Sequence, residues 1–439
     1  MAVRLGERLG TLLRGAIGAK PGELSACLAA LAYIFLLFAA YAILRPVRDA
    51  MGIEGGDEDL PLLFVGTFLV MLAAVPAYGW LCSRYPRGVF LPWVYLFFVL
   101  NLLGFYAVFA ADPGNVIAAW AFFIWLSVFN LFVVSVFWSF MADVFSRDQA
   151  KRLFGFLAAG ASAGFIVGPA FTAGYAELLG TSNLILISAF LLALPILLIR
   201  YLLVWSARSE ASKDYVAGEA PPAGGQAMGG NPFAGFTIFF RSPYLLTLGL
   251  FFVLYTSIST FIYLQQADLV SNAFASSEDR TRVFALIDLA VNVLSIGTQL
   301  FLTGRIVRTV GMVVALAALP VAMVGGFLLL AAAPTLGVLI AVQIFRRAGN
   351  YAITRPAREM LYTVLDQESK YKAKNVIDTV VYRGGDALNG GFFALLKYFG
   401  MAMTGTALVG AVVAALWAAC AITLGRWYQK VPEGAGPNY

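Results

Sequence analysis

The stretch GEAPPAGGQAMGG, residues 218–230, divides the chain, because about six long apolar runs precede it and about six follow it. Gly, Pro and Ala dominate this stretch, a composition typical of a mobile linker rather than of a packed element. A helix needs about 20 mostly apolar residues to cross a bilayer. The sequence therefore predicts an all-α polytopic membrane protein in which two six-helix halves flank a linker.

The apolar runs also predict where each membrane span lies. About twelve runs have the necessary length, near residues 24–45, 62–81, 89–110, 116–142, 153–175, 183–204, 244–264, 283–304, 311–333, 335–362, 374–398 and 403–425. The predicted organisation is an amphipathic segment at 1–22, one half at 23–205, the linker at 206–243, the other half at 244–427 and a tail at 428–439. Leucines at helical spacing between arginines predict that the first segment lies on the membrane surface.

Composition excludes most other classes of protein. Of the 439 residues, 61% are hydrophobic and only 12% are charged, against about 25% charged in an ordinary soluble domain. A water-soluble enzyme, a disordered regulator and a secreted disulfide scaffold are therefore excluded. The chain has no histidine and only three scattered cysteines, so we expect neither a metal site nor a cofactor. No nucleophile–base pair is visible, which argues against an enzyme.

The distribution of basic residues predicts the orientation in the membrane. If the N-terminus is inside, most Lys and Arg residues fall on the inner side, and the outer loops carry little besides Arg280 and Arg282. Cytoplasmic loops of membrane proteins are enriched in these two residue types. We therefore expect both termini in the cytoplasm and a multi-pass protein in a bacterial cytoplasmic (inner) membrane.

An internal repeat places charge inside two of the expected spans. The sequence YAILRPVRD at residues 41–49 matches YAITRPARE at residues 351–359, with the shared pattern YAIxRPxR followed by an acid. The two expected helices run in opposite directions, as in the inverted repeats of many transporters. The proline in each copy removes a backbone hydrogen bond and permits a bend. We hypothesise that Arg45 and Arg355 form equivalent cationic stations near opposite gates.

Charged residues within the expected spans are the candidate functional residues. A charge near the middle of a membrane is costly unless it faces water or a partner. Arg346 and Arg347 reach that depth, since they lie about a dozen residues into the tenth span. The candidate substrate-binding residues are Arg45, Arg48, Arg346, Arg347, Asn350, Tyr351, Arg355, Arg358 and Arg383. The candidate gating or coupling residues are Asp49, Asp288, Glu359, Asp378 and Asp386.

Two interpretations of these charges stay open. The acids nearly balance the arginines, so ion pairs such as Arg45 with Asp49 could serve packing alone. The other interpretation is that the arginines bind an anion. The guanidinium group presents a rigid fork that matches carboxylate and phosphate, and these positions carry arginine rather than lysine. We favour anion binding.

Two six-helix halves joined by an inner loop resemble the major facilitator superfamily. In that fold the first, fourth, seventh and tenth helices line a central cavity, so the resemblance implies that both copies of the repeat lie near the cavity. The expected fifth helix carries Gly160, Gly164 and Gly168 followed by Pro169. Some exchangers of the superfamily have a similar glycine-rich helix, but small residues four apart also allow helices to pack closely. We favour close packing.

A further motif resembles the ATP:ADP antiporter (nucleotide transporter) family. The segment YKAKNVIDTVVYRGGD at residues 371–386 is similar to the Lys-x-Lys, Ile-Asp and Arg-x-Gly pattern of that family. The resemblance implies a carrier for anionic nucleotides or related compounds. It also implies that Lys372, Lys374 and Asp378 act with Arg383 at the substrate site or at a gate.

We therefore expect a secondary active transporter that moves an organic anion, such as a nucleotide or related phosphate compound, by alternating-access exchange. The expected partners are an anionic small-molecule substrate and the lipid bilayer, with no nucleic acid, and we expect a monomer. The alternative is a proton-coupled exporter of a peptide, metabolite or drug-like compound, in which Asp288, Asp378 or Asp386 would carry the proton. A membrane receptor or lipid-handling protein is a third alternative.

Overall fold

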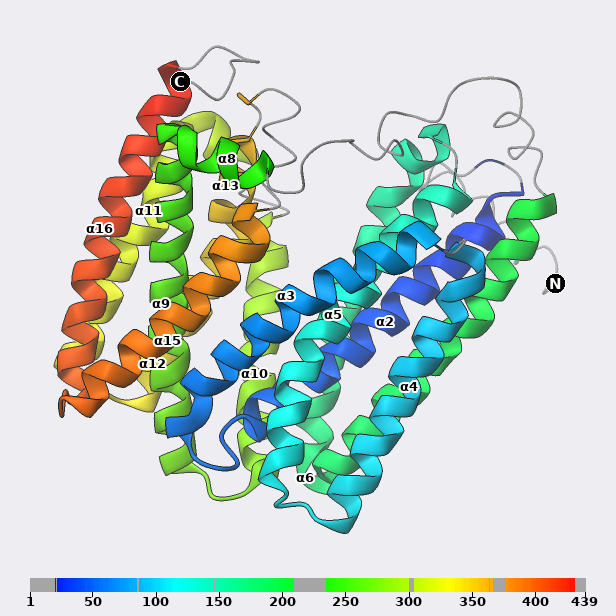
Figure 1. Cartoon of the computed structure of the whole chain (residues 1–439), viewed down its shortest axis with the longest axis horizontal. Coiled ribbons are helices and arrows are strands. Elements are labelled where there is room, and N and C mark those ends of the chain that lie inside the picture. The colour runs from blue at the N-terminus through cyan, green and yellow to red at the C-terminus, as the bar shows by residue number, and fades with distance from the viewer. Residues whose placement is uncertain are drawn as a thin grey trace, which may run out of the picture. The chain divides into compact units, whose positions relative to one another are not determined.

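The computed structural model describes residues 20, 22–84, 87–145, 147–208, 234–299, 304–362, 364–365 and 376–430 (Figure 1). Helices make up nearly all of these residues. Lys372 and Lys374 lie outside the described residues, as does most of the predicted amphipathic segment at 1–22. For Asp378 the structure describes the backbone and not the side chain.

The chain packs into two compact units. The first unit comprises Met1–Met51, Ala73–Ala227 and Ser277–Leu289, and the second comprises Gly52–Leu72, Met228–Ser276 and Ala290–Tyr439. Two helices change unit along their length, since α3 (Leu60–Arg84) begins in the second unit and α10 (Ser277–Thr298) begins in the first. The division into two six-helix halves at residues 23–205 and 244–427 stays a prediction.

The first unit is built around α2 and α6. Besides parts of α3 and α10, it contains α2 (Leu24–Met51), α4 (Arg87–Ala111), α5 (Val116–Val144) and α6 (Arg147–Arg208). Gly180 in α6 has a φ of 76°, a left-handed conformation that glycine adopts without strain. This residue separates the fifth expected span from the sixth.

The second unit contains the helices of the candidate site. Besides η1 (Asp57–Asp59) and parts of α3 and α10, this unit contains α8 (Ala234–Arg241), α9 (Pro243–Ala273), α11 (Gly304–Ala332), α12 (Leu336–Gly349), η3 (Asn350–Thr354), α13 (Arg355–Met360), η4 (Ile377–Val381), α15 (Tyr382–Tyr398) and α16 (Met403–Lys430). In Figure 1, α16 (red) lies beside α11 (yellow). The helix α9 packs against α12, α15 and α16, so it is the central helix of this unit.

The expected membrane spans are confirmed as helices over the described residues. Eight stretches are long and apolar enough to cross a bilayer, namely Leu24–Met51, Leu91–Ala111, Val116–Trp138, Phe156–Ala207, Pro243–Ala273, Ser277–Thr298, Gly311–Ala332 and Met403–Lys430. Phe156–Ala207 contains two expected spans. The remaining spans fall on α3, on the run from α12 to α13, and on η4 with α15. The fold is therefore that of an all-α, multi-pass membrane protein.

Glycines on α6 allow this helix to pack closely against α2. An ideal Cβ placed on Gly164 would lie 2.8 Å from the backbone nitrogen of Ala39 and 2.8 Å from the carbonyl oxygen of Phe35. A Cβ on Gly168 would lie 2.8 Å from the carbonyl oxygen of Ala39. Because backbone atoms cannot rotate away, a larger residue requires the two helices to move apart. The predicted close packing is confirmed.

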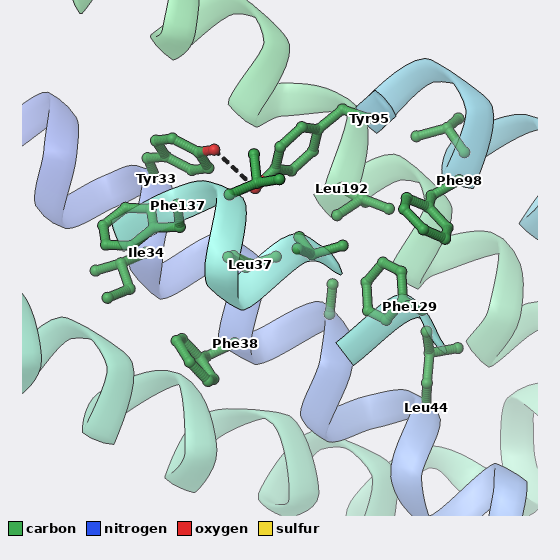
Figure 2. Close-up of a cluster of buried hydrophobic side chains, with 14 of the residues drawn as sticks. Tyr33, Ile34, Leu37, Phe38, Leu44, Tyr95, Phe98, Phe129, Phe137 and Leu192 are labelled. Atoms are coloured by element: carbon green, nitrogen blue, oxygen red, sulfur yellow. Dashed lines mark hydrogen bonds between the residues drawn. The ribbon is translucent and has the colours of Figure 1, made fainter. Parts of the chain in front are cut away.

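A polar pair lies inside the apolar core of the first unit (Figure 2). The hydroxyl of Tyr33, on α2, donates a hydrogen bond of 2.7 Å to the hydroxyl of Tyr95, on α4, and both side chains are fully buried. The ring of Phe137, on α5, meets the ring of Tyr33 edge to face, with 4.8 Å between the centroids. A buried hydroxyl without a partner costs about 1–3 kcal/mol, so pairing the two hydroxyls avoids that cost for both side chains.

Candidate substrate site

A π turn shapes the second copy of the sequence repeat. The helix α12 is regular up to Gly349, and Asn350–Thr354 then forms a π turn before α13 begins. The N–H of Arg355 donates to the carbonyl of Asn350, five residues earlier. The first copy, at residues 41–49, is α-helical throughout. Single π turns inside α-helices are rare and are frequent at functional sites.

Proline chemistry explains how the turn is completed. Pro356 has no N–H, so it cannot donate to the carbonyl of Tyr351, which lies five residues earlier. The Nε2 of Gln299, just after α10, donates to that carbonyl at 3.0 Å instead. Pro46 stands at the equivalent place in α2, where the helix stays regular. The surroundings of the motif therefore decide its backbone conformation.

Arg346 is deeply buried and is held by uncharged groups. The residue is 4% exposed, and its Nε and Nη2 donate to the Oε1 of Gln343 at 3.1 and 2.8 Å. The Nε2 of Gln343 donates in turn to the Oε1 of Gln266, on α9, at 2.7 Å. An amide carries no charge. It therefore orients the guanidinium group without neutralising it.

Arg358 lies against aromatic rings. Its guanidinium carbon is 4.4 Å from the ring centroid of Phe252 and 5.9 Å from that of Tyr255, both on α9. A guanidinium group over a ring face gains about 0.5–2 kcal/mol. The residue is 8% exposed, and its Nε has no hydrogen-bond partner among the described residues. This is a second buried guanidinium group that contacts uncharged side chains.

Arg383 and Asp386 form an ion pair one turn apart on α15. The Nη1 of Arg383 lies 3.7 Å from the Oδ2 of Asp386. The guanidinium group of Arg383 also lies 5.8 Å from the ring centroid of Tyr382. Asp386 is within electrostatic range of Arg346 as well, and it lies beside Thr260 of α9. One carboxylate therefore interacts with two guanidinium groups.

The other candidates of the tenth span lie on the same helical run. Asn350 is buried, and its Oδ1 has no hydrogen-bond partner among the described residues. Arg347, Tyr351 and Glu359 are half-buried, and Arg355 is exposed. Besides Asp386, the residues within electrostatic range of Arg346 include Tyr255, Arg347, Tyr351 and Tyr382. We use the name arginine cluster for Tyr255, Arg346, Arg347, Tyr351, Arg358, Tyr382, Arg383 and Asp386.

The first copy of the repeat lies in the first unit, where its arginines meet carboxylates. The Nη2 and Nε of Arg48 donate to the Oδ1 of Asp49 at 2.6 and 3.0 Å. The guanidinium group of Arg48 also lies 4.9 Å from the ring centroid of Phe123, on α5. The Nη1 of Arg45 lies 3.7 Å from the Oδ2 of Asp288, on α10. The structure thus pairs Arg45 with a carboxylate on another helix.

Sequence reasoning does not single out Gln343 or Phe252, although these residues contact the two buried arginines. Gln343 precedes Arg346 by three residues on α12, so helical spacing places both on one face. That spacing is the signal available in the sequence. Phe252 gives no such signal, because one more aromatic residue in a membrane helix is ordinary.

A multi-pass helical fold with charged groups kept in its interior is typical of membrane transporters. The sequence profile of the Major Facilitator Superfamily matches residues 24–358. This match covers more than half of the chain, so the protein belongs to that superfamily, whose members are transporters rather than enzymes.

Curated relatives show a weaker likeness. The chain is 24% identical over 333 residues to ADP,ATP carrier protein 1 of Chlamydia trachomatis serovar D, and the match covers 67% of this chain and 62% of the relative. It is 24% identical over 302 residues to the protein of the same name from Chlamydia muridarum, with 60% and 56% covered. The matched part thus spans less than two thirds of the length of these relatives.

Solved structures resemble the whole chain in fold. A bacterial homolog of the human lysosomal transporter Spinster, solved in an inward-facing and unoccupied conformation, has a TM-score of 0.62 at 14% identity and covers 94% of this chain and 98% of its own. A POT family transporter in complex with a thioalcohol-conjugated peptide has a TM-score of 0.64 at 11% identity, with 91% and 96% covered. The nucleoside transporter NupG has a TM-score of 0.58 at 12% identity, with 92% and 99% covered.

Proposed function

We propose that this protein is a secondary transporter that exchanges organic anions by alternating access. The arginine cluster of the second unit would bind the anion. The proposal includes a bacterial cytoplasmic membrane as the location, cytoplasmic termini and a monomeric carrier. Nucleotides and related phosphate compounds are the proposed substrate class.

One observation carries the proposal. Arg346 and Arg358 are buried, yet within the part of the chain that the structure describes no carboxylate lies at ion-pair distance from either of them. A charge inside a membrane protein is costly unless water or a partner compensates it. A bound anion supplies that compensation. The geometry therefore favours binding of a negatively charged solute over a purely structural role.

The choice of nucleotides rests on two kinds of support. A guanidinium group can give two parallel hydrogen bonds to phosphate, which adds geometric specificity to the charge. The curated relatives that match over part of the chain are named as ADP,ATP carriers. Exchange also suits a cationic site, because a returning anion compensates the arginines during each half of the cycle.

The test is counterflow in liposomes that contain the purified protein. Vesicles loaded with unlabelled ADP should take up labelled ATP without a pH gradient, and vesicles loaded with citrate or buffer alone should take up less. Arg346→Gln should slow the exchange about tenfold or more, since a hydrogen bond to a charged group contributes roughly 1.5–3 kcal/mol. Arg355→Gln tests the exposed arginine of the same repeat copy and should also slow it.

A matched control removes a positive charge elsewhere in the same unit. Lys397 pairs with Asp268 at 2.9 Å, and its side chain is exposed, so Lys397→Gln should leave exchange close to the wild-type rate. Exchange that is equally fast in all three variants would refute the site. A wild-type protein that exchanges no nucleotide would refute the substrate class.

Proton coupling is the second candidate function, and Asp386 favours it. This carboxylate pairs with Arg383 and is within electrostatic range of Arg346, so a proton could compete with an internal ion pair. Proton-driven accumulation should collapse when the pH gradient is removed, whereas exchange should persist. Asp386→Asn should abolish accumulation driven by the gradient if the carboxylate carries the proton, and exchange should continue.

A further inference from the structure

A chain of two amide side chains holds Arg346 in place. The Oε1 of Gln343 accepts from both Nε and Nη2 of Arg346, at 3.1 and 2.8 Å. The Nε2 of Gln343 donates to the Oε1 of Gln266 at 2.7 Å. Both glutamines are buried, at 2% and 3% exposure. The chain therefore runs from α9 to the guanidinium group through uncharged groups alone.

The direction of each hydrogen bond follows from the chemistry of the groups. Arginine has only donors, so the oxygen of Gln343 must face Arg346. The amide nitrogen of Gln343 then faces away and needs an acceptor, which Gln266 supplies through its oxygen. With its side chain held at both ends, Gln343 has one orientation, and it fixes the guanidinium plane of Arg346 in turn.

We propose that Gln343 is a positioning residue, which orients Arg346 for the substrate anion without adding a carboxylate at hydrogen-bond distance from the guanidinium group. This inference rests on the proposed function. Glutamate has nearly the same shape and would accept the same two hydrogen bonds, but it would form an internal ion pair. A substrate anion would then have to displace that carboxylate. Glutamine at this position holds the group equally well and does not compete.

The bonding pattern leaves donors for the anion. A guanidinium group has five N–H donors, and the hydrogen bonds of Arg346 within the described residues use Nε and Nη2. Within that part of the chain, the Nη1 group is left for the anion. A phosphate or carboxylate oxygen that binds there meets a group already oriented, so little side-chain entropy is lost on binding.

The test compares a negative charge introduced at Gln343, on α12, with a negative charge introduced at Gln265, on α9. Gln343→Glu should weaken ADP binding to the detergent-purified protein at least tenfold, and it should preserve or raise the melting temperature because an ion pair forms with Arg346. Gln265→Glu is the matched control. Gln265 lies on α9 next to Gln266 and is buried like Gln343. Its Nε2, however, donates to the Oγ1 of Thr406 at 2.9 Å, and it makes no hydrogen bond to Arg346 among the described residues. This variant should change the ADP dissociation constant less than threefold.

Two further measurements separate positioning from a merely structural role. Gln343→Glu should weaken ATP binding by a larger factor than AMP binding, because the lost attraction grows with the charge of the ligand. In an Arg346→Gln background, Gln343→Leu should change the ADP dissociation constant less than twofold, because Gln343 then has no guanidinium group to orient. Gln343→Leu adds no charge and should weaken ADP binding because Arg346 is no longer held in one orientation. This variant replaces Gln343→Glu in the test if Gln343→Glu does not fold.

The outcomes distinguish this inference from the proposed function. If Gln343→Glu and Gln343→Leu bind ADP as tightly as wild type while Arg346→Gln does not, the positioning role is refuted and the anion site stands. If Gln265→Glu weakens binding as strongly as Gln343→Glu, the effect is one of general charge and the inference is also refuted. If the wild-type protein binds none of ADP, ATP and citrate, the proposed function fails and the inference fails with it.

Discussion

Replacing Gly164 with alanine tests how closely α2 and α6 must approach. The new Cβ would lie 2.8 Å from two backbone atoms of α2, the nitrogen of Ala39 and the carbonyl oxygen of Phe35, and 3.0 Å from the Cβ of Phe38. Ordinary van der Waals contact begins at 3.4 Å, so the two backbone distances are about 0.6 Å too short. Neither backbone atom can rotate away, and the two helices must separate.

The magnitude follows from two opposing effects. Overpacking a well-packed interior costs about 1–3 kcal/mol. Alanine in place of glycine in a helix stabilises by up to about 1 kcal/mol. With about 2 kcal/mol for overpacking and about 1 kcal/mol for the helix effect, the net loss is about 1 kcal/mol, which lowers the melting temperature of a unit of this size by about 2–4 °C.

The matched control is Gly174→Ala on the same helix. A Cβ at Gly174 meets nothing within 4 Å, so only the favourable helix effect remains and the melting temperature should stay the same or rise slightly. The assay is the loss of the monodisperse peak on size exclusion after heating the detergent-purified protein. A Gly164→Ala protein that melts at or above the wild-type temperature would show that the two helices can separate without loss, and the packing argument would fall.

The remaining predictions concern polar groups inside the first unit. Tyr33→Phe removes the hydroxyl that donates to Tyr95 and should lower the melting temperature by a few degrees, since a net hydrogen bond contributes about 0.5–1.5 kcal/mol. The control Tyr175→Phe changes an exposed ring and should leave the melting temperature unchanged. Equal melting temperatures for the two variants would contradict the prediction. Asp288→Asn removes a carboxylate partner of the half-buried Arg45 and should destabilise the protein. Adding Arg45→Gln should restore part of the loss, because no unmatched charge is then buried; a double variant less stable than either single variant would argue against an ion-pair role.

The spans could be predicted because apolar length is a local property of the sequence. The run from residue 24 to 45 and the run from 403 to 425, for example, need no tertiary information to be recognised as membrane helices. The close approach at Gly164 was also accessible, since small residues four apart have a direct steric meaning. What these features share is that each depends on one continuous segment of the sequence.

The partners of the arginines could not be predicted in the same way. Helical spacing offers Asp49 as a partner for Arg45 but gives no indication of Asp288 on α10, which the structure places 3.7 Å from Arg45. Arg346 depends on Gln266, which comes from α9 and is distant in sequence. Which helices become neighbours is decided by packing of whole helices, and a periodic pattern in one segment contains no information about the facing segment.

The two copies of the repeat show why partner identity matters more than the motif. In the first unit, Arg48 donates to Asp49 and Arg45 lies near Asp288, so an anion that binds there must compete with internal carboxylates. Beside the second copy, Arg346 is held by an amide and Arg358 lies against aromatic rings, so within the described residues an anion displaces no carboxylate at ion-pair distance from these two groups. For the same guanidinium chemistry, the free energy gained by an incoming anion is therefore larger in the second unit. The hypothesis that Arg45 and Arg355 form equivalent cationic stations consequently requires the ion pairs of the first unit to open during the transport cycle. An Asp288→Glu variant conserves the charge; if it slows exchange without changing the affinity for ADP, that result would indicate such an opening.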